Sequence, residues 1–285
     1  MIRHRLTDEQ WTVVCPLIPV STAPTDRPAR NPREMLDGIL WILVTGAAWR
    51  DLPQDFGPWE TVYCYFARWQ RTGVFQNIFT ALQVKLDEAG KLDWSAWCVD
   101  GTSIRASRAA GGAGKKSLDS HELEPADHAL GYSKGGFGTK VHIVTDARGL
   151  PLAAELTAGQ THESTQAESV IAWALTYQSR DGEDLRVPQK LLGDKGYSAE
   201  RVREWLIDCG IEPVIARKSN EHKREAESFD AETYRKRNAI ERCIGWLKEC
   251  RRFATRFEKL AVRFAAMVQL AMIRRYLHVG FSNSA

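Results

Sequence analysis

The stretch YRKRNAIERCIGWLK, from Tyr234 to Lys248, decides how the rest of the chain is interpreted. On a helix of ~3.6 residues per turn, Glu241 shares one narrow stripe with several cations and a glycine. The stripe, which lies within about 40° of Glu241, comprises Tyr234, Arg237, Gly245, Lys248 and Arg252. The opposite side is predicted to be buried and carries Ala239, Cys243, Trp246, Leu247, Cys250 and Phe257. A carboxylate among cations suits a metal ion and a phosphate. A solvated face with i,i+4 ion pairs is the alternative.

The composition is that of a globular protein. The chain has 285 residues, of which 44% are hydrophobic and 26% are charged, enough for a substantial core. Its apolar runs are too short to cross a membrane, and the start MIRHRL lacks the apolar segment of a signal peptide. We therefore expect no membrane partner and residence in the compartment of synthesis. The six cysteines form no CxxC pair, which favours reduced thiols over a zinc site.

Charge is distributed unevenly along the chain. Residues 215–279 hold 16 Lys and Arg against 8 Asp and Glu, a net charge of +8, whereas the whole chain carries only +3. A folded basic segment of this kind predicts a polyanionic partner, and nucleic acid is the usual one. A basic solvated tail is the alternative, but the aromatic and aliphatic residues interleaved with the cations favour a folded segment.

Residues 1–90 are predicted to form a small all-α N-terminal domain. Capping signals begin helices at Thr7 and Asn31, and glycines end or interrupt the later ones. The third predicted helix is aromatic and basic, with Arg68 and Arg71 on it. This arrangement resembles a helix-turn-helix and predicts DNA binding. The alternative is a helical cap that packs on the rest of the protein.

Residues 91–285 are predicted to form an α/β domain. Short β-prone runs alternate with amphipathic segments, and GTKVHIVTD with LPLAAELT predicts a hairpin. The order of these elements indicates a mixed sheet flanked by helices. A long loop is expected at 105–136, which is rich in Gly, Ala, Ser and Lys and shows no periodicity.

Two of the predicted strands end in aspartates, Asp100 in WCVDG and Asp194 in LLGDKGY. Ligands of open α/β sheets bind beyond the carboxyl ends of the strands, so both carboxylates are expected on one rim. Glu241 can supply a third. Three hard oxygen ligands favour Mg²⁺ or Mn²⁺. Two such ions ~4 Å apart suit phosphodiester chemistry. Taken singly, an aspartate at a strand end is more often a turn or a helix cap, but the three acids together with the cationic stripe reverse that preference.

Weaker signals surround these acids. Lys134 and Lys140 in SKGGFGTK are candidates to bind phosphates, although this segment is also consistent with a flexible hairpin entrance. His162 is expected either near the metal rim or in a capping role. GGAGKKS departs from the P-loop pattern, so we expect no nucleotide cofactor.

The spacing Tyr-x2-Arg-x3-Glu-x6-Lys, from Tyr234 to Lys248, resembles the signature of a known family. The family is the IS5 group (IS4/IS5 superfamily) of bacterial insertion-sequence DDE transposases. Asp100 and Asp194 lie 94 positions apart, and Asp194 and Glu241 lie 47 apart, as expected for the group. The resemblance covers nearly the whole chain through GAAWRDLP, FGPW, VDGT, GYSKGGFGTKVHIVTDARGLPL, LLGDKGY and RCIGWLKECRRFATRFEKL.

This resemblance implies an RNase H-like catalytic core with Asp100, Asp194 and Glu241 as the catalytic, metal-binding triad. It also implies DNA cleavage at the terminal inverted repeats of the element and joining of the freed 3′-OH to target DNA, with two Mg²⁺ or Mn²⁺ ions. Lys248 would contact DNA, supported by Tyr234 and Arg237, and Arg252 either extends that track or pairs with Glu249. The implied setting is a homo-oligomer on double-stranded DNA, in the bacterial cytoplasm and associated with the nucleoid.

Two alternatives remain open on the sequence. The chain could be a catalytically inactive DNA-binding repressor derived from a transposase, or a stand-alone RNase H-like nuclease. The intact acidic triad opposes the first, and strand-transfer products would exclude the second.

Overall fold

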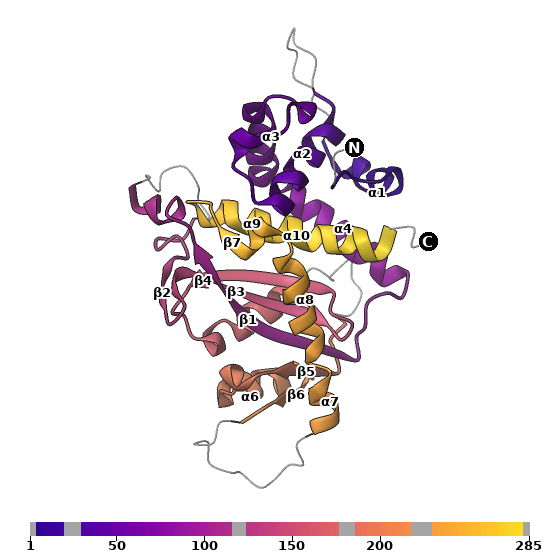
Figure 1. Cartoon of the computed structure of the whole chain (residues 1–285). Coiled ribbons are helices and arrows are strands. Elements are labelled where there is room, and N and C mark those ends of the chain that lie inside the picture. Colours follow the sequence, from indigo (N-terminus) through magenta and orange to yellow (C-terminus); the bar gives the residue numbers. More distant parts are fainter. Residues whose placement is uncertain (1–3, 20–29, 116–123, 177–185, 218–229, 282–285) are drawn as a thin grey trace. The chain divides into compact units, whose positions relative to one another are not determined.

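The computed structural model describes residues 4–19, 30–115, 124–176, 186–217 and 230–281 (Figure 1). The chain forms two compact units. One comprises Met1–Lys85, Ser107–Pro125 and Leu247–Ala285, and the other comprises Leu86–Ala106 and Ala126–Trp246. The C-terminal residues thus group with the N-terminal helices. A functional division at residue 90 stays a prediction.

The first unit is helical, and its first two helices begin at the capping residues predicted from the sequence. Thr7 begins the first helix with a reciprocal capping box to Gln10, and Asn31 caps the second, which has Pro32 at its first position. The longer helices are α1 (Asp8–Val14), α2 (Pro32–Thr45), α3 (Trp59–Arg71), α4 (Val74–Glu88) and α10 (Ala261–Phe281). The short elements are η1 (Cys15–Leu17), η2 (Trp49–Asp51), η3 (Gln54–Phe56), η4 (Ala110–Lys115), α9 (Arg251–Ala254) and β7 (Thr255–Arg256).

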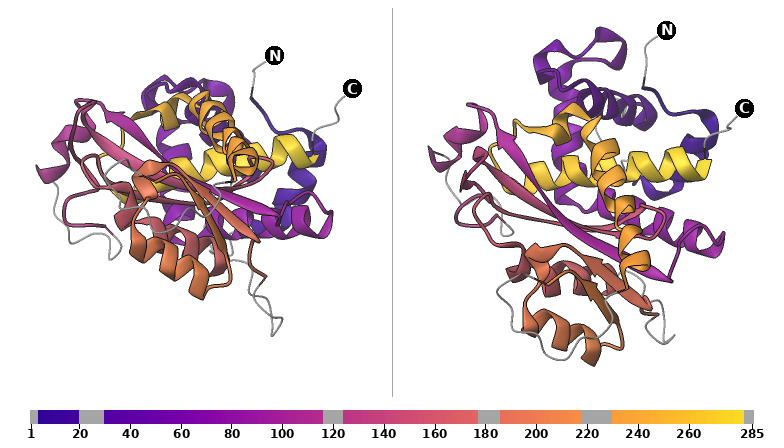
Figure 2. Two further views of the ribbon diagram at one scale, coloured as in Figure 1. Left: turned by 90° about the horizontal axis from the view of Figure 1, so that it is seen from below. Right: turned by 60° about the horizontal axis from the view of Figure 1, so that its bottom comes forward.

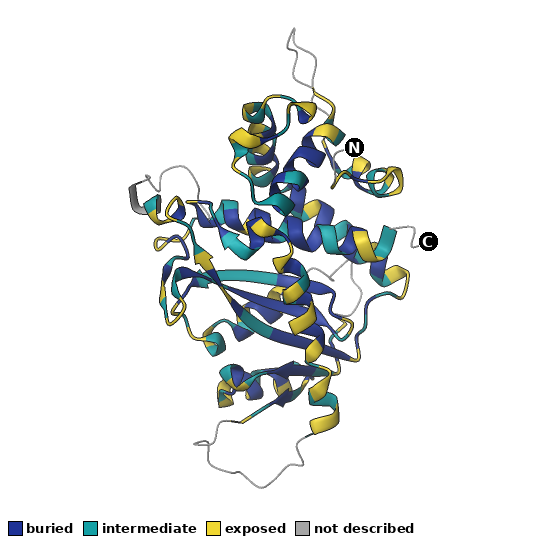
Figure 3. Ribbon diagram, in the orientation of Figure 1, coloured by how far each residue is buried: buried dark blue, intermediate teal, exposed yellow. Residues whose placement is uncertain are grey.

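The core of the first unit lies among α2, α3 and α10, whose inner sides are buried (Figure 3). The apolar face of α2, formed by Met35, Ile39, Ile42 and Leu43, is fully enclosed. In α4, Phe79 stacks on Tyr276 of α10 with ring centroids 5.1 Å apart. The C-terminal helix is therefore a core component of this unit.

The second unit is built on a mixed sheet, as predicted. Its strands follow the order β2-β3-β1-β5-β6. In addition, β4 pairs with residues 139–145 of β3, on the edge of β3 that faces away from β1. The pairs β1–β3, β2–β3 and β3–β4 are antiparallel, whereas β1–β5 and β5–β6 are parallel. The strands are β1 (Ala96–Ala106), β2 (Gly131–Ser133), β3 (Gly136–Asp146), β4 (Pro151–Ala158), β5 (Lys190–Gly193) and β6 (Glu212–Ile215).

Helices flank this sheet, with α5 against β3 and β4, and α6 against β6 (Figure 2). The helices of this unit are α5 (Ala167–Thr176), α6 (Glu200–Asp208), α7 (Ala231–Arg235) and α8 (Asn238–Lys248), with the short turns η6 (Glu163–Thr165) and η7 (Lys195–Tyr197). The start of α8 contacts the β3–β4 turn. A Cβ on Gly149 would lie 2.7 Å from the carbonyl oxygen of Ala239.

Two expectations about local structure are wrong. The segment 105–136 is not a continuous loop, because β1 extends to Ala106, η4 follows it, and β2 forms at Gly131–Ser133. Residues 116–123 of that segment lie outside the described residues. The stretch that carries Glu241 is also not one helix. It turns between Arg235 and Asn238, and α8 ends at Lys248. Tyr234 and Arg252 therefore lie on other elements than Glu241.

Among the described residues, no helix has both the length and the apolarity needed to span a bilayer.

We predict that Gly149→Ala destabilises the protein more than Gly210→Ala. Both glycines have positive φ, +84° and +75°, so each alanine incurs a backbone cost of about 1–2 kcal/mol. Only residue 149 also faces α8, and overpacking there adds about 1–3 kcal/mol. Urea denaturation of the two variants measures the difference. Equal losses would show that α8 does not need the close approach at Gly149.

Candidate functional site

The two predicted aspartates are brought together by parallel pairing of their strands. Val99 of β1 is level with Gly193 of β5, and this is where the parallel pairing ends. Asp100 and Asp194 are the next residues on the two strands, so they lie on one rim as predicted. One detail differs, because Asp100 does not end its strand. The antiparallel partner β3 holds β1 extended as far as Arg105.

Asp100 is a half-buried carboxylate with two donors. Its Oδ1 accepts the backbone N–H of Gly101 at 2.8 Å, and its Oδ2 accepts Nη1 of Arg237 at 2.9 Å. Burial raises the pKa of Asp100, and the neighbouring carboxylate of Asp194 raises it further. The Gly101 amide and the Arg237 guanidinium act in the opposite direction, since each favours the ionised form.

Arg237 links Asp100 to Glu241. Its Nη2 donates to Glu241 Oε1 at 2.6 Å while Nη1 holds Asp100, and its guanidinium lies 5.9 Å from the ring of Tyr234. The i,i+4 ion pair considered as the alternative for this stripe therefore exists, but it is half of a bridge to a residue 137 positions away. Glu241 is 54% exposed on the side chain and Arg237 is 17% exposed, so the Asp100 end of the bridge is the better shielded.

Asp194 also has a local structural role. Its Oδ1 accepts the backbone N–H of Gly196 at 2.7 Å and so caps the short helix η7. The helix-cap alternative is thus correct for Asp194, without removing it from the rim. Tyr197 is buried at the end of the same turn. Burial raises the pKa of its hydroxyl well above the usual value, and the nearby Asp100, Glu163 and Asp194 carboxylates add to this.

The acids fit a hard divalent cation in their chemistry. They provide carboxylate oxygens with no thiol or imidazole among them, which is the donor set of Mg²⁺ and Mn²⁺. In the part of the chain that the structure describes, no three acidic, histidine or cysteine side chains are grouped closely enough to hold an ion as they stand. Arg237 explains this spacing, because its guanidinium lies between Asp100 and Glu241.

The remaining predicted contacts fall into two classes. Lys134 in the β2–β3 turn, Lys248 in the last turn of α8, and Arg68 and Arg71 in α3 are exposed. Lys140 is instead held by Glu163, with Nζ to Oε1 at 3.2 Å.

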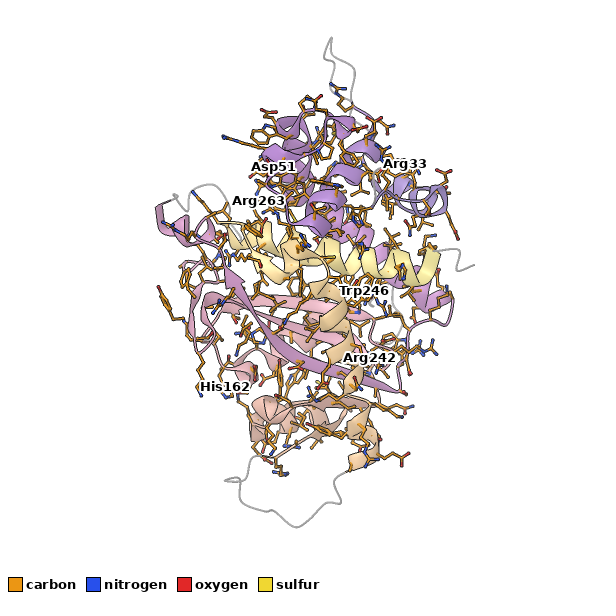
Figure 4. The ribbon with its side chains drawn as sticks, viewed as in Figure 1. Arg33, Asp51, His162, Arg242, Trp246 and Arg263 are labelled. Carbon is orange, nitrogen blue, oxygen red and sulfur yellow. The ribbon has the colours of Figure 1, made fainter. Side chains whose placement is uncertain are left out.

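Local contacts show what His162 and Arg252 do in the structure. His162, labelled in Figure 4, caps η6 by accepting the Ser164 N–H at 3.3 Å, so the capping alternative is confirmed. Arg252 was expected on the stripe of Glu241, which is wrong. It is buried, and donates to Glu258 Oε1 at 2.9 Å and to the Ala47 carbonyl at 2.7 Å. Its ionic partner in the structure is Glu258 and not the predicted Glu249, and contact of Arg252 with DNA stays a prediction.

Sequence reasoning missed Glu163. Its side chain lies against Gly101 and Gly196, the glycines that follow Asp100 and Asp194 most closely. The only local signal was its position directly after His162, at the end of the second hairpin strand.

Comparison with known proteins identifies the family to which this site belongs. The family described as "Transposase DDE domain" matches residues 95–275, which include Asp100, Asp194 and Glu241. The chain belongs to this family. A second family, described as "Putative transposase of IS4/5 family", matches residues 6–79. The predicted transposase family, and the α/β core with a mixed sheet and a helical N-terminal region, are thereby confirmed.

Individual relatives agree with this assignment. The chain is 38% identical over 133 residues to "Putative transposase for insertion sequence element IS402" of Burkholderia cepacia, a match that spans 47% of this chain and 60% of that relative. It is 29% identical to "Putative transposase for insertion sequence element IS6501" of Brucella ovis, over 47% of this chain and 93% of the relative. A solved "Mos1 transposase paired-end complex with left transposon end" aligns over 81% of this chain and 83% of its own, at 12% identity and a TM-score of 0.27, too low to support an argument.

We predict that Arg237→Ala lowers the free energy of unfolding by about 2 kcal/mol, because it leaves the half-buried Asp100 carboxylate without its charged donor. The exposed Glu241 end of the bridge contributes little. Arg235→Ala, two residues away on the exposed side of α7, is the control and should change stability by less than about 0.5 kcal/mol. Thermal and urea denaturation without divalent ions measure both. Equal effects would show that the bridge adds no stability.

Proposed function

We propose that the chain is a divalent-cation-dependent DNA transposase. It cuts DNA at the terminal inverted repeats of its own element and joins the freed 3′-OH to target DNA. The observation that carries this proposal is the register of β1 and β5. It sets Asp100 beside Asp194 at the rim, and Arg237 ties Asp100 to Glu241 within a DDE transposase domain.

Asp100, Asp194 and Glu241 would together hold two divalent cations, either Mg²⁺ or Mn²⁺. When bound, such ions would supply Lewis-acid activation of the attacking oxygen and stabilisation of the leaving oxygen. The protein's own contribution is to hold ionised carboxylates on one rim and to keep cations beside them. The guanidinium of Arg237, which lies beside Asp100 and Glu241, would also donate to a phosphate oxygen of bound DNA. That donation would stabilise charge developing on the phosphate.

DNA contact is assigned to exposed cations. Lys248 suits a backbone phosphate, because an ammonium is a point charge rather than a fork that recognises a base edge. Tyr234 supports Arg237 through its ring. Lys134, Arg68 and Arg71 are the other exposed candidates from the sequence, with the α3 residues in the proposed N-terminal DNA-binding domain, 1–90. We further propose action as a homo-oligomer on paired ends, at the nucleoid of a bacterial cytoplasm.

Asp194→Asn is predicted to abolish cutting while leaving DNA binding intact. The change keeps the helix-capping oxygen of residue 194 but removes the charge needed by the cation, so nicking of labelled terminal-repeat DNA in Mg²⁺ or Mn²⁺ should fall by at least about 100-fold. Asp208→Asn, on the exposed end of α6, is the control. Nicking of the repeat DNA at the wild-type rate by Asp194→Asn would refute the proposed function. DNA binding by the wild type without any nicking would favour the repressor alternative, and nicking without joined products would favour the nuclease.

Lys248→Ala is predicted to weaken binding of all DNA sequences alike. Loss of one phosphate contact should reduce the slope of log K against log salt by about 1. Lys85→Ala in α4 is the matched exposed lysine. Fluorescence anisotropy across a salt series gives both slopes. A change that depends on DNA sequence, or no change in slope, would contradict a backbone role for Lys248.

A further inference from the structure

We infer that Glu163 is a fourth carboxylate of the divalent-cation site and binds the ion together with Asp194. This inference rests on the proposed function and names a residue for the same site. It begins with the space around Gly196. A Cβ on that residue would overlap the Glu163 carboxylate and would lie 2.8 Å from Asp194 Oδ1. The carboxylates of Glu163 and Asp194 therefore lie on either side of the same small space next to Gly196.

The second aspartate-bearing strand meets the same side chain. A Cβ on Gly101 would lie 3.1 Å from Glu163 Cγ and 3.2 Å from Glu163 Oε1. Gly101 and Gly196, the two glycines beside the Glu163 carboxylate, each follow an aspartate of the rim within two positions. Absence of a side chain at 101 and 196 is what lets the carboxylate approach this closely.

Glu163 reaches the rim from the sheet face opposite to Arg237. Consecutive residues of a strand point to opposite faces, so Gly101 faces away from the side to which Asp100 extends toward α8. On the α8 side Arg237 holds both Asp100 and Glu241, and on the opposite side Lys140 holds Glu163. Asp100 and Asp194 lie at the rim where the two faces meet.

Lys140 holds Glu163 in the structure as Arg237 holds Asp100 and Glu241. Its Nζ lies 3.2 Å from Glu163 Oε1, and the side chains are 14% and 24% exposed. A divalent ion at Asp194 competes with Lys140 for the same carboxylate. This competition separates an ion ligand from a plain salt bridge, because the two partners of the pair should then affect ion binding in opposite directions.

The test is Mn²⁺ binding to the full chain, followed by the electron paramagnetic resonance signal of free Mn²⁺, with no DNA present. Glu163→Gln keeps the shape of the side chain and should weaken Mn²⁺ binding by about 10-fold or more. Gly196→Ala should weaken it similarly by displacing Glu163 and Asp194. Lys140→Met should tighten binding, because it frees Glu163 from its competitor.

A matched ion pair provides the control. Lys190 Nζ lies 3.2 Å from Glu212 Oε1, the same distance as in the Lys140–Glu163 pair, but away from the rim. Glu212→Gln should leave Mn²⁺ binding unchanged. Melting temperatures without metal check that each variant is folded, and a variant that unfolds is replaced by the Lys140→Met/Glu163→Gln double variant, which lacks both charges and should bind Mn²⁺ as weakly as Glu163→Gln.

The outcomes distinguish this inference from the proposed function. If Glu163→Gln binds Mn²⁺ like the wild type while Asp194→Asn does not, Glu163 is no ligand and the proposed function stands. If Lys140→Met weakens binding as much as Glu163→Gln, the pair is structural and the inference fails. If Asp194→Asn also keeps full Mn²⁺ affinity, the proposed function itself is overturned.

Discussion

Parallel pairing of β1 with β5 is the constraint on which the site depends. Because the register sets Val99 beside Gly193, the chain has no freedom to separate Asp100 from Asp194. Two carboxylates on one rim repel each other, and burial makes ionisation of Asp100 less favourable still. Every other feature of the site can be understood as a response to this concentrated negative charge.

Cationic side chains from separate elements balance this negative charge. Arg237, from the turn before α8, donates to both Asp100 and Glu241, and Lys140, from β3, donates to Glu163. Guanidinium forks bridge two carboxylates more readily than ammonium groups do, which suits arginine to the longer bridge. A site organised in this way holds its acids ready for divalent cations and places positive charge where a phosphate of DNA would approach.

Glycines set how closely these elements approach. Gly149 lets the start of α8 approach the β3–β4 turn, and Gly101 and Gly196 leave room for Glu163. A side chain at Gly149 would press on the backbone of α8, and one at Gly101 or Gly196 would displace the Glu163 carboxylate, so these positions belong to the site although they carry no functional group. Figure 3 shows α8 with one side buried and the other exposed, and Glu241 is one of its exposed residues.

The sequence by itself determined the mixed sheet, the hairpin, the two rim aspartates and Glu241, because β-prone runs followed by an aspartate and helix periodicity are local signals. Tertiary structure alone decided three things: the turn that breaks the stretch before Asn238, the buried pairing of Arg252 with Glu258, and the place of Glu163. The physical reason is that a helical period assumes one unbroken helix and relates only residues on that helix. A 3.6-residue period orders neighbours on one helix, but it contains no information on Arg237 meeting a carboxylate 137 residues away.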